Sequence, residues 1–100
     1  MYEWSPKMTA KMERKVALVT GGGSGFGRAT ALAFAREGAR VVVADVFEEG
    51  GIETIHLIEN AGGKAIYIKC DVSKAAEVDA MVNKGVGTYG RLDYVIINPI

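Results

Sequence analysis

Four short apolar runs alternate with three segments of helical periodicity, and this alternation constrains the fold more than any other feature. Strands are expected over residues 16–19, 41–44, 65–69 and 92–97. Runs this short and this rich in β-branched residues are typical of strands covered on both faces of a sheet. Strict alternation with helices predicts parallel β-α-β units with right-handed crossovers. The expected fold class is therefore α/β, a doubly wound parallel sheet of about four strands and three helices in the order 3-2-1-4.

The three helical segments carry apolar residues at intervals of three or four, as one buried helix face requires. Their apolar positions are Ala29, Leu32 and Ala33; Ile52, Ile55 and Ile58; and Val78, Met81, Val82, Val86 and Tyr89. Gly38 and Gly62 stand where the first two helices should end. Ser73 stands where it would N-cap the third.

Charge and composition exclude several function classes. The 100 residues contain 12 Lys and Arg against 12 Asp and Glu, so the formal net charge is zero and gives no field for nucleic acid or an anionic membrane. One Cys forms no internal disulfide, and one Cys with one His cannot furnish a zinc site. The sequence has neither an apolar run near 18 residues nor a secretory signal pattern. We expect no metal, no nucleic-acid or membrane partner, and a cytoplasmic location.

The turn after the first strand is suited to close approach of a ligand to the backbone. Residues 20–27 read Thr-Gly-Gly-Gly-Ser-Gly-Phe-Gly. Glycines permit positive φ without an obstructing Cβ, and the start of a helix adds a favourable dipole, so a diphosphate could bind to several N–H groups. We expect Gly21, Gly25 and Gly27 to carry these roles. The alternative is a tight strand-to-helix connection without a ligand.

The glycine spacing separates this turn from two familiar phosphate loops. It is Gly-x-x-x-Gly-x-Gly, whereas the usual dinucleotide fingerprint is Gly-x-Gly-x-x-Gly. A Walker loop is excluded because no Lys-Ser or Lys-Thr follows the glycines. The turn therefore indicates a phosphate site of a different pattern.

Asp45 ends the second predicted strand, at the crevice where the strand order reverses. A carboxylate there can accept hydrogen bonds from both hydroxyls of an adenosine ribose. It follows Gly27 by 45 − 27 = 18 residues, close to the spacing of about 20 typical of that role. No Arg or Lys occupies positions 22, 23, 24 or 46 to pair with a 2′-phosphate, so NAD is favoured over NADP. The alternative is a solvated strand-end or helix-capping carboxylate.

Together these features resemble the short-chain dehydrogenase/reductase family, whose first turn has the pattern Thr-Gly-x-x-x-Gly-x-Gly. The resemblance extends over about residues 15–98 and includes Asp45, the Asp71-Val72 pair and the segment 89–93, which reads Tyr-Gly-Arg-Leu-Asp. It implies a Rossmann-like fold. It also implies an NAD-dependent oxidoreductase that transfers hydride between NAD(H) and a small alcohol or ketone.

The resemblance also implies which residues bind the cofactor. They are Thr20, Gly21, Ser24, Gly25, Phe26, Gly27, Asp45, Val46, Asp71, Val72 and Asn98. In the family, the carboxylate of Asp71 and the backbone of Val72 would contact the adenine edge, and Asn98 would brace the sheet beside the nicotinamide. An ordinary capping turn is the alternative for Asp71. The family usually reads Asn-Asn-Ala-Gly after the fourth strand, and here only Asn98 matches, because Pro99 and Ile100 follow it.

The family's catalytic pair, a Tyr with a Lys four residues later that lowers its pKa, is absent. The Tyr residues at positions 2, 67, 89 and 94 are followed four residues later by Pro, Asp, Asp and Asn. We expect residues 1–14 to form a flexible arm and residues 15–100 an NAD-binding Rossmann domain, apparently truncated after the fourth strand. This chain alone should be inactive, and the full-length enzyme should be a homo-oligomer, a dimer or tetramer. The alternatives are a noncatalytic dinucleotide-binding or regulatory module and a flavodoxin-like phosphate or flavin binder.

Overall fold

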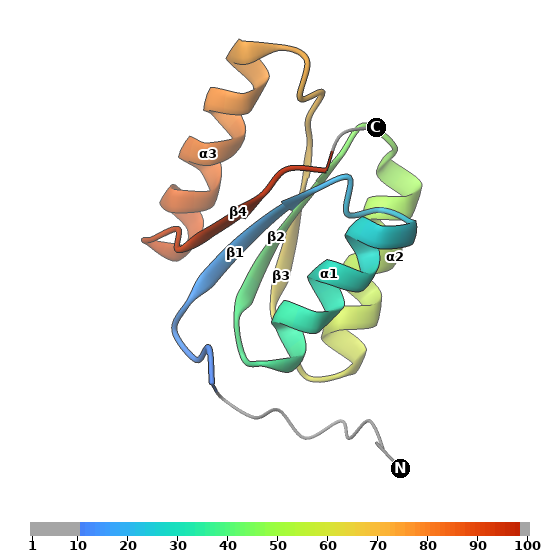
Figure 1. Ribbon diagram of the computed structural model, residues 1–100, viewed down its shortest axis with the longest axis vertical. Coiled ribbons are helices and arrows are strands. Elements are labelled where there is room, and N and C mark those ends of the chain that lie inside the picture. Colours follow the sequence, from blue (N-terminus) through green and yellow to red (C-terminus); the bar gives the residue numbers. More distant parts are fainter. Residues whose placement is uncertain (1–10, 99–100) are drawn as a thin grey trace.

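The computed structural model describes residues 11–98, in which strands and helices alternate from β1 to β4. The strands are β1 (Val16–Thr20), β2 (Arg40–Asp45), β3 (Ala65–Lys69) and β4 (Tyr94–Ile96). The helices are α1 (Gly25–Arg36), α2 (Glu48–Asn60) and α3 (Ala75–Tyr89). All strand pairs are parallel, and the order is β3-β2-β1-β4 (Figure 1). The expected doubly wound α/β fold is confirmed.

The strand order creates a crevice at one end of the sheet. From β1 the chain winds outward to β3 and then crosses back to place β4 on the other side of β1. Helices α1 and α2 cover one face of the sheet, and α3 covers the opposite face (Figure 1). The connections after β1 and β4 therefore leave in different directions, and ligands of such folds bind between them. Within the described part of the chain, no helix is long and apolar enough to cross a membrane.

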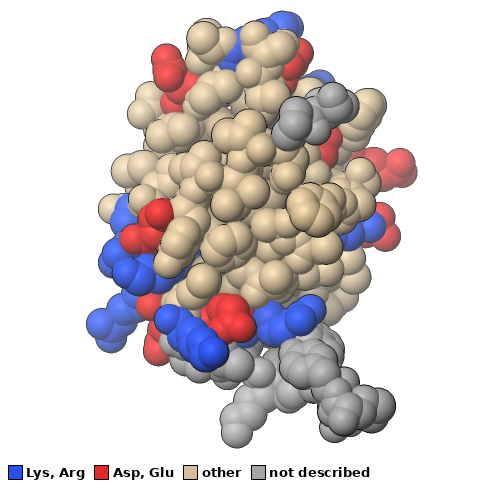
Figure 2. Space-filling model, viewed as in Figure 1, with Lys and Arg blue, Asp and Glu red and all other residues tan. Residues whose placement is uncertain are grey.

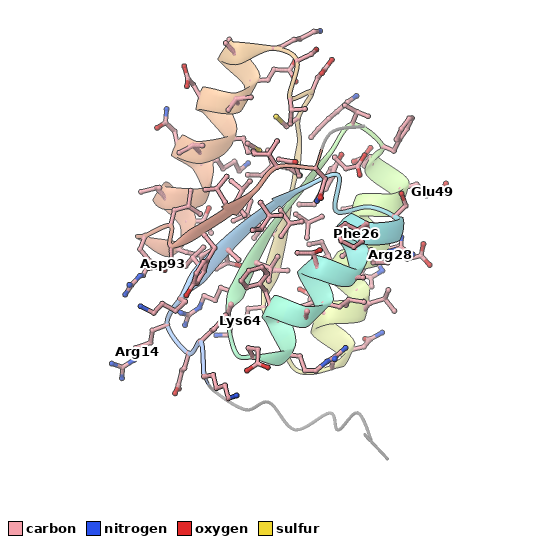
Figure 3. All side chains as sticks on the ribbon, viewed as in Figure 1. Arg14, Phe26, Arg28, Glu49, Lys64 and Asp93 are labelled. Atoms are coloured by element: carbon pink, nitrogen blue, oxygen red, sulfur yellow. The ribbon has the colours of Figure 1, made fainter. Side chains whose placement is uncertain are left out.

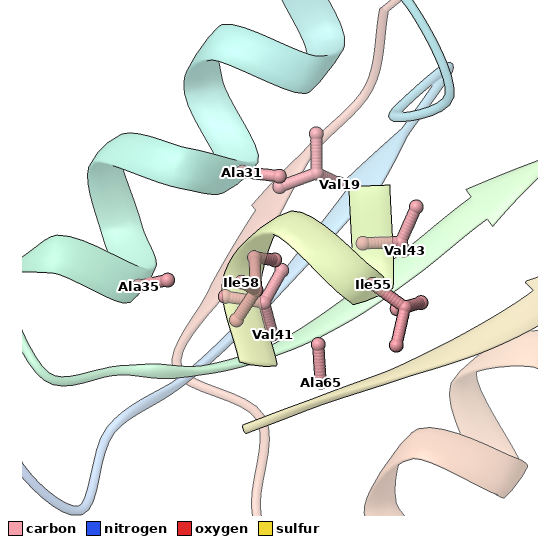
Figure 4. Packing of buried hydrophobic residues seen from close by; sticks show 8 residues of the cluster. All are labelled: Val19, Ala31, Ala35, Val41, Val43, Ile55, Ile58 and Ala65. Atoms are coloured by element: carbon pink, nitrogen blue, oxygen red, sulfur yellow. The ribbon is translucent and has the colours of Figure 1, made fainter. Parts of the chain in front are cut away.

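Side chains of the strands alternate between two hydrophobic clusters, one on each face of the sheet. Val19, Val41 and Val43 pack toward α1 and α2, whereas Leu18 and Val42 pack toward α3. The first cluster, shown in Figure 4, also contains Ala31, Ala35, Ile55, Ile58 and Ala65. The second also contains Val16, Ala44, Cys70 and Met81. Since both faces are covered, β1 and residues 41–44 of β2 are apolar at nearly every position.

Asp93 joins the approach to β4 to the start of β1. Its Oδ2 accepts a hydrogen bond from the Val16 N–H at 2.8 Å, and its own N–H donates to the Val16 carbonyl at 2.9 Å. Arg91 donates to both carboxylate oxygens of Asp93, at 2.8 and 2.9 Å. The strand therefore begins at Tyr94 rather than at Leu92 as expected, because the residue before it bonds to β1 partly through its side chain.

The exposed side of β4 forms an edge of the sheet within the described residues. This strand pairs with β1, with Ala17 opposite Tyr94. Tyr94, Val95 and Ile97 are exposed. Figure 2, viewed from the same side as Figure 1, shows an uncharged surface over the centre of the molecule, with most of the charged side chains around it. An edge of this kind leaves backbone groups open to pairing with another strand.

The start of α3 differs from the sequence prediction. Its N-cap is Lys74, which makes no side-chain capping hydrogen bond. Ser73 does not cap the helix, because it stands one residue before the N-cap. Its N–H and Oγ instead both donate to Oδ1 of Asp71, at 2.9 and 2.7 Å, since short polar side chains readily bond to groups two residues away.

The predicted flexible arm over residues 1–14 lies largely outside the described residues. Its last part, residues 11–14, forms a turn before β1. The Met12 N–H donates to the Glu37 carbonyl at 2.7 Å, and the Lys15 N–H donates to the Met12 carbonyl at 2.9 Å. The first bond ties the beginning of the described chain to the end of α1, and the second closes the turn.

We predict that Asp93→Asn lowers stability near neutral pH and flattens its pH dependence. Hydrogen bonds from the Arg91 side chain and the Val16 N–H hold the pKa of Asp93 below its usual range. A carboxyl with a lowered folded-state pKa stabilises the fold above its unfolded pKa of about 3.9, and this contribution is lost as the pH falls through the folded-state pKa. Urea unfolding should show the largest difference from wild type near pH ~7 and a shrinking difference toward pH ~2.

The exposed Asp79 provides a matched control for this experiment. Asp79→Asn should follow wild type across the same pH range. A deficit for Asp93→Asn that stays constant down to low pH would contradict an electrostatic role for its carboxylate.

Candidate functional site

The glycine loop between β1 and α1 lies at the carboxyl end of the sheet and adopts the expected backbone conformation. Gly21 and Gly25 have φ of 63° and 51°, the left-handed region that favours glycine. Gly27 is required for a different reason. A Cβ placed there would overlap the carbonyl oxygen of Gly21, so the loop can fold back on α1 only without a side chain at this position.

The N-terminus of α1 is free of acidic side chains. Its N-cap is Ser24, which is exposed and makes no side-chain capping hydrogen bond, and its first turn contains no Asp or Glu. In contrast, α2 carries Glu48 and Glu49 in its first turn. The partial positive charge at the start of α1 is therefore not offset by a carboxylate of its own first turn, and an anionic group would be stabilised there.

Thr20 and Asn98 clamp the ends of β1 and β4 together. The Asn98 N–H donates to Oγ1 of Thr20 at 2.8 Å, and the Asn98 side-chain amide donates to the Thr20 carbonyl at 2.8 Å. The Thr20 hydroxyl lies 3.4 Å from the carbonyl oxygen of Ile96 and donates to it. The bracing role implied for Asn98 thus has a structural basis in bonds to both the side chain and the backbone of Thr20.

Asp45 is a buried carboxylate with defined partners. It is only 8% exposed. Oδ2 accepts a hydrogen bond from the Gly23 N–H, and Oδ1 accepts one from the Phe47 N–H, each at 2.9 Å. Asp45 is therefore not a solvated strand-end carboxylate. It does resemble a helix-capping residue in part, because it accepts a hydrogen bond from the N–H of Phe47, the N-cap residue of α2. A carboxylate has about four lone-pair sites, so both oxygens can still accept hydroxyl donors.

Tyr67 fixes the backbone of the same residue from β3. Its hydroxyl donates to the Asp45 carbonyl at 2.7 Å. Burial raises the pKa of the Tyr67 hydroxyl, with Asp45 and Glu48 adding to the shift, so the phenol keeps the proton that it donates. The ring lies where a Cβ on Gly51 would be, which explains a glycine early in α2. This contact could not be predicted from the sequence, because no motif marks it.

A cavity of about 240 Å³ lies between the glycine loop and the ends of β2 and β4. Its walls are formed by Gly21, Ser24, Gly25, Phe26, Gly27, Asp45, Phe47 and Asn98. All but one of these are residues that the sequence predicted for the site. The exception is Phe47, which is 70% exposed, and Phe26 is 82% exposed. The sequence signal that could have identified Phe47 is an aromatic residue among the three carboxylates of the segment Asp-Val-Phe-Glu-Glu.

A second cavity, of about 300 Å³, lies at the other end of the sheet. Its lining includes Arg14, Arg40 and Lys64 and none of the predicted site residues. Figure 3 shows Arg14 and Lys64 at this end, and Phe26 and Arg28 at the start of α1 at the opposite end. The smaller cavity, rather than the larger, is therefore the candidate site.

Four predicted site residues do not line the cavity. Thr20 is buried beneath it, Val46 is half-buried beside Asp45, and Asp71 and Val72 are half-buried in the connection after β3. The carboxylate of Asp71 accepts the two hydrogen bonds from Ser73 described above, and these bonds lower the pKa of Asp71. These bonds are the ones expected of Asp71 as an ordinary turn residue, which is the alternative to an adenine contact.

Cys70 is a core residue. It is 3% exposed and packs in the cluster under α3. Burial raises the pKa of its thiol, and Glu77 and Asp71 raise it further. Since the thiolate is the nucleophilic form, this environment makes the residue unreactive.

Comparison with known proteins identifies the family. The sequence pattern described as short chain dehydrogenase matches residues 15–99. The chain belongs to the short-chain dehydrogenase family. This short-chain dehydrogenase sequence is 49% identical over 84 residues to an uncharacterized oxidoreductase of Thermotoga maritima, covering 84% of this chain and 33% of that protein. The chain thus spans about a third of the length of the curated relatives it matches.

Solved structures of short-chain dehydrogenases share the fold. A crystal structure of a hydroxysteroid dehydrogenase from Escherichia coli matches with a TM-score of 0.86 and 30% identity, covering 90% of this chain and 38% of that one. A short chain dehydrogenase/reductase from Burkholderia phymatum, solved in complex with NAD, matches with a TM-score of 0.81 and 36% identity. That match covers 85% of this chain and 30% of the other. The Rossmann-like fold implied by the sequence is confirmed.

We predict that Gly27→Ala destabilises the protein more than Gly25→Ala. The methyl group at position 27 meets backbone, and overpacking of this kind costs about 1–3 kcal/mol or more. At position 25 the methyl group meets open space, and only the left-handed backbone conformation is penalised, by roughly 1–2 kcal/mol. Urea unfolding of both variants checks the order. Equal losses, or a larger loss at position 25, would show that the loop does not pack as described.

Proposed function

We propose that this chain is the cofactor-binding part of an NAD-dependent oxidoreductase of the short-chain dehydrogenase/reductase type. The observation that carries the proposal is the buried carboxylate of Asp45, held against the glycine loop in the wall of the cavity. The family assignment supports it, as does the likeness to a short chain dehydrogenase/reductase solved in complex with NAD. The substrate class that we propose is a small alcohol or ketone.

The residues at the site fit a dinucleotide. Backbone N–H groups of residues 24–27, at a helix start without its own acidic residues, would hold the diphosphate. Asp45 would accept the ribose hydroxyls, and Val46, Asp71 and Val72 would lie on the adenine side. Thr20 and Asn98 would border the nicotinamide, since the hydrogen bonds between them fix the ends of β1 and β4.

Within the reaction, this chain binds and orients the cofactor. When bound, the nicotinamide group would supply hydride transfer between an alcohol and a ketone, and the hydroxyl proton would move separately. The loop, α1 and Asp45 would fix the position of the nicotinamide through the diphosphate and the ribose. We assign no proton-transfer step to a residue of this chain, because none of its Tyr residues is followed four positions later by Lys.

We propose NAD rather than NADP on electrostatic grounds. A 2′-phosphate would approach the negative charge of Asp45. None of the described residues that line the cavity is Lys or Arg, so no positive side chain in its wall would offset the repulsion. The nearest basic residue of α1, Arg28, already donates to the carbonyls of Gly23 and Gly50 and to Glu53.

We predict that Asp45→Ala weakens NADH binding and reduces the preference for NADH over NADPH. Charge-assisted hydrogen bonds contribute about 1.5–3 kcal/mol, which corresponds to roughly 10- to 150-fold in affinity. Adding Val46→Arg should move the preference further toward NADPH by supplying a partner for the phosphate. Fluorescence titration of both cofactors at one ionic strength, on proteins made from the complete reading frame that encodes this chain, provides the measurement.

Asp45→Asn is the control for the structural role of this residue. The Asn side chain keeps an oxygen that can accept a hydrogen bond from the Gly23 N–H, but it has no negative charge. This variant therefore separates the effect of losing the loop contact from the effect of losing the repulsion of a 2′-phosphate. Circular dichroism should show that each variant is folded. A wild type that prefers NADPH, or a preference unchanged in both Asp45 variants, would contradict the assignment of NAD.

We predict that a polypeptide of these 100 residues alone produces no NADH from a panel of small alcohols. Without an acid–base pair, the proton transfer loses an enhancement of about 10² to 10⁴ in rate. Steady NADH formation, followed by absorbance, would refute this. The protein made from the complete reading frame is the comparison: turnover by that protein favours the enzyme, and binding without turnover favours the noncatalytic module. Homo-oligomerisation and a cytoplasmic location stay predictions of the sequence.

A further inference from the structure

Thr54 is a fully buried polar residue outside the cavity, and its hydroxyl connects α2 to the glycine loop. Oγ1 donates to the Gly22 carbonyl at 2.7 Å and accepts from Nε of Arg28 at 2.9 Å. The carbonyl of Gly50, one helical turn earlier, lies 3.2 Å away. Since a hydroxyl has a single proton, the shorter contact to Gly22 takes it. Thr54 therefore uses its donor on the loop instead of on its own helix.

The bond from Thr54 acts on the peptide that holds Asp45. The carbonyl of Gly22 and the N–H of Gly23 belong to one planar trans peptide and point in opposite directions. Thr54 fixes the carbonyl side, and the N–H side donates to Oδ2 of Asp45 at 2.9 Å. A rotation of this peptide would break both bonds, so the orientation of the Asp45 carboxylate depends on the partner of the Gly22 carbonyl.

Arg28 holds the next peptide of the loop in the same way. Its Nη2 donates to the Gly23 carbonyl at 2.6 Å and to the Gly50 carbonyl at 3.2 Å. The loop and α2 touch closely here, because a Cβ on Gly50 would lie 2.6 Å from the carbonyl oxygen of Gly23. Figure 3 shows Arg28 where α1 begins, with Glu49 in the first turn of α2 at the same end. Two successive loop carbonyls are thus fixed by side chains of α1 and α2.

We propose that Thr54 is a positioning residue for dinucleotide selectivity, which it exerts through the Gly22–Gly23 peptide on the carboxylate of Asp45. This inference rests on the proposed function, because it takes the ribose of NAD as the group that Asp45 receives. The hydroxyl is not needed to fill the core. Valine has nearly the same shape, and the neighbouring Ile55 and Ile58 show that this face of α2 packs as an apolar surface. The loop carbonyl is what requires a donor at position 54.

The test compares Thr54→Val with Thr54→Ser in protein made from the complete reading frame. Thr54→Val removes the donor at nearly constant volume, and we expect NADH affinity to fall about fivefold, the effect of one hydrogen bond. NADPH affinity should change less, so the NADH-to-NADPH preference falls. Thr54→Ser keeps the hydroxyl and should retain the wild-type preference. Ile58→Val, which removes one methyl group from the same buried face of α2, should lower the melting temperature without changing the preference.

A double-mutant cycle decides whether Thr54 acts through Asp45. In an Asp45→Ala background, Thr54→Val should produce no further change in the cofactor preference, whereas independent effects would add. Should Thr54→Val fail to fold, Thr54→Ala, which also removes the donor to the Gly22 carbonyl but places no methyl group against it, carries the same expectation. If the wild type binds NADH but Thr54→Val leaves the cofactor preference unchanged, the positioning role alone is overturned. Failure of the wild type to bind NADH would overturn the proposed function and this inference with it.

Discussion

The requirement that a parallel sheet be covered on both faces determines most of this structure. Parallel strands need long connections, and the right-handed crossovers place α1 and α2 on one face and α3 on the other (Figure 1). The chain must therefore reverse its direction of winding once, between β3 and β4. The crevice that receives a ligand is a consequence of that reversal. The polar residues Thr20 and Asn98 lie beside it because Thr20 ends β1 and Asn98 follows the end of β4.

The site is held mainly by bonds from side chains to backbone. Thr20, Asp45 and Thr54 are the buried polar residues of the described chain, and the side chain of each bonds to a main-chain group of the loop or near a strand end. Buried hydroxyls and carboxylates are costly unless they are paired. Here the same bonds that satisfy them also immobilise the glycine loop. A loop made mainly of glycine therefore acquires a defined shape from its neighbours.

The fold could be predicted from the sequence more completely than the site. Periodicity alone located the strands and helices, since the apolar positions of Val41–Ala44 or Ile52–Ile58 permit few other arrangements. The glycine loop and Asp45 were also visible, because each is a local motif. Partners far apart in sequence were not visible. The bond from the Tyr67 hydroxyl to the Asp45 carbonyl depends on how β3 pairs with β2, and the bond from the Thr54 hydroxyl to the Gly22 carbonyl depends on how α2 packs against the loop. Ser73 was misassigned because α3 begins one residue later than expected, with Lys74 as its N-cap.

The paired bonds between Asp93 and Val16 also set the register of β4. They align Tyr94 with Ala17, and every later residue of the strand follows from that alignment. A slip by one residue would turn Ile96 away from the α1 side of the sheet and bring Ile97 instead of Asn98 to the end of β1. A carboxylate at the amino end of the strand thus fixes the register, and the register determines which side chain reaches the crevice at the other end.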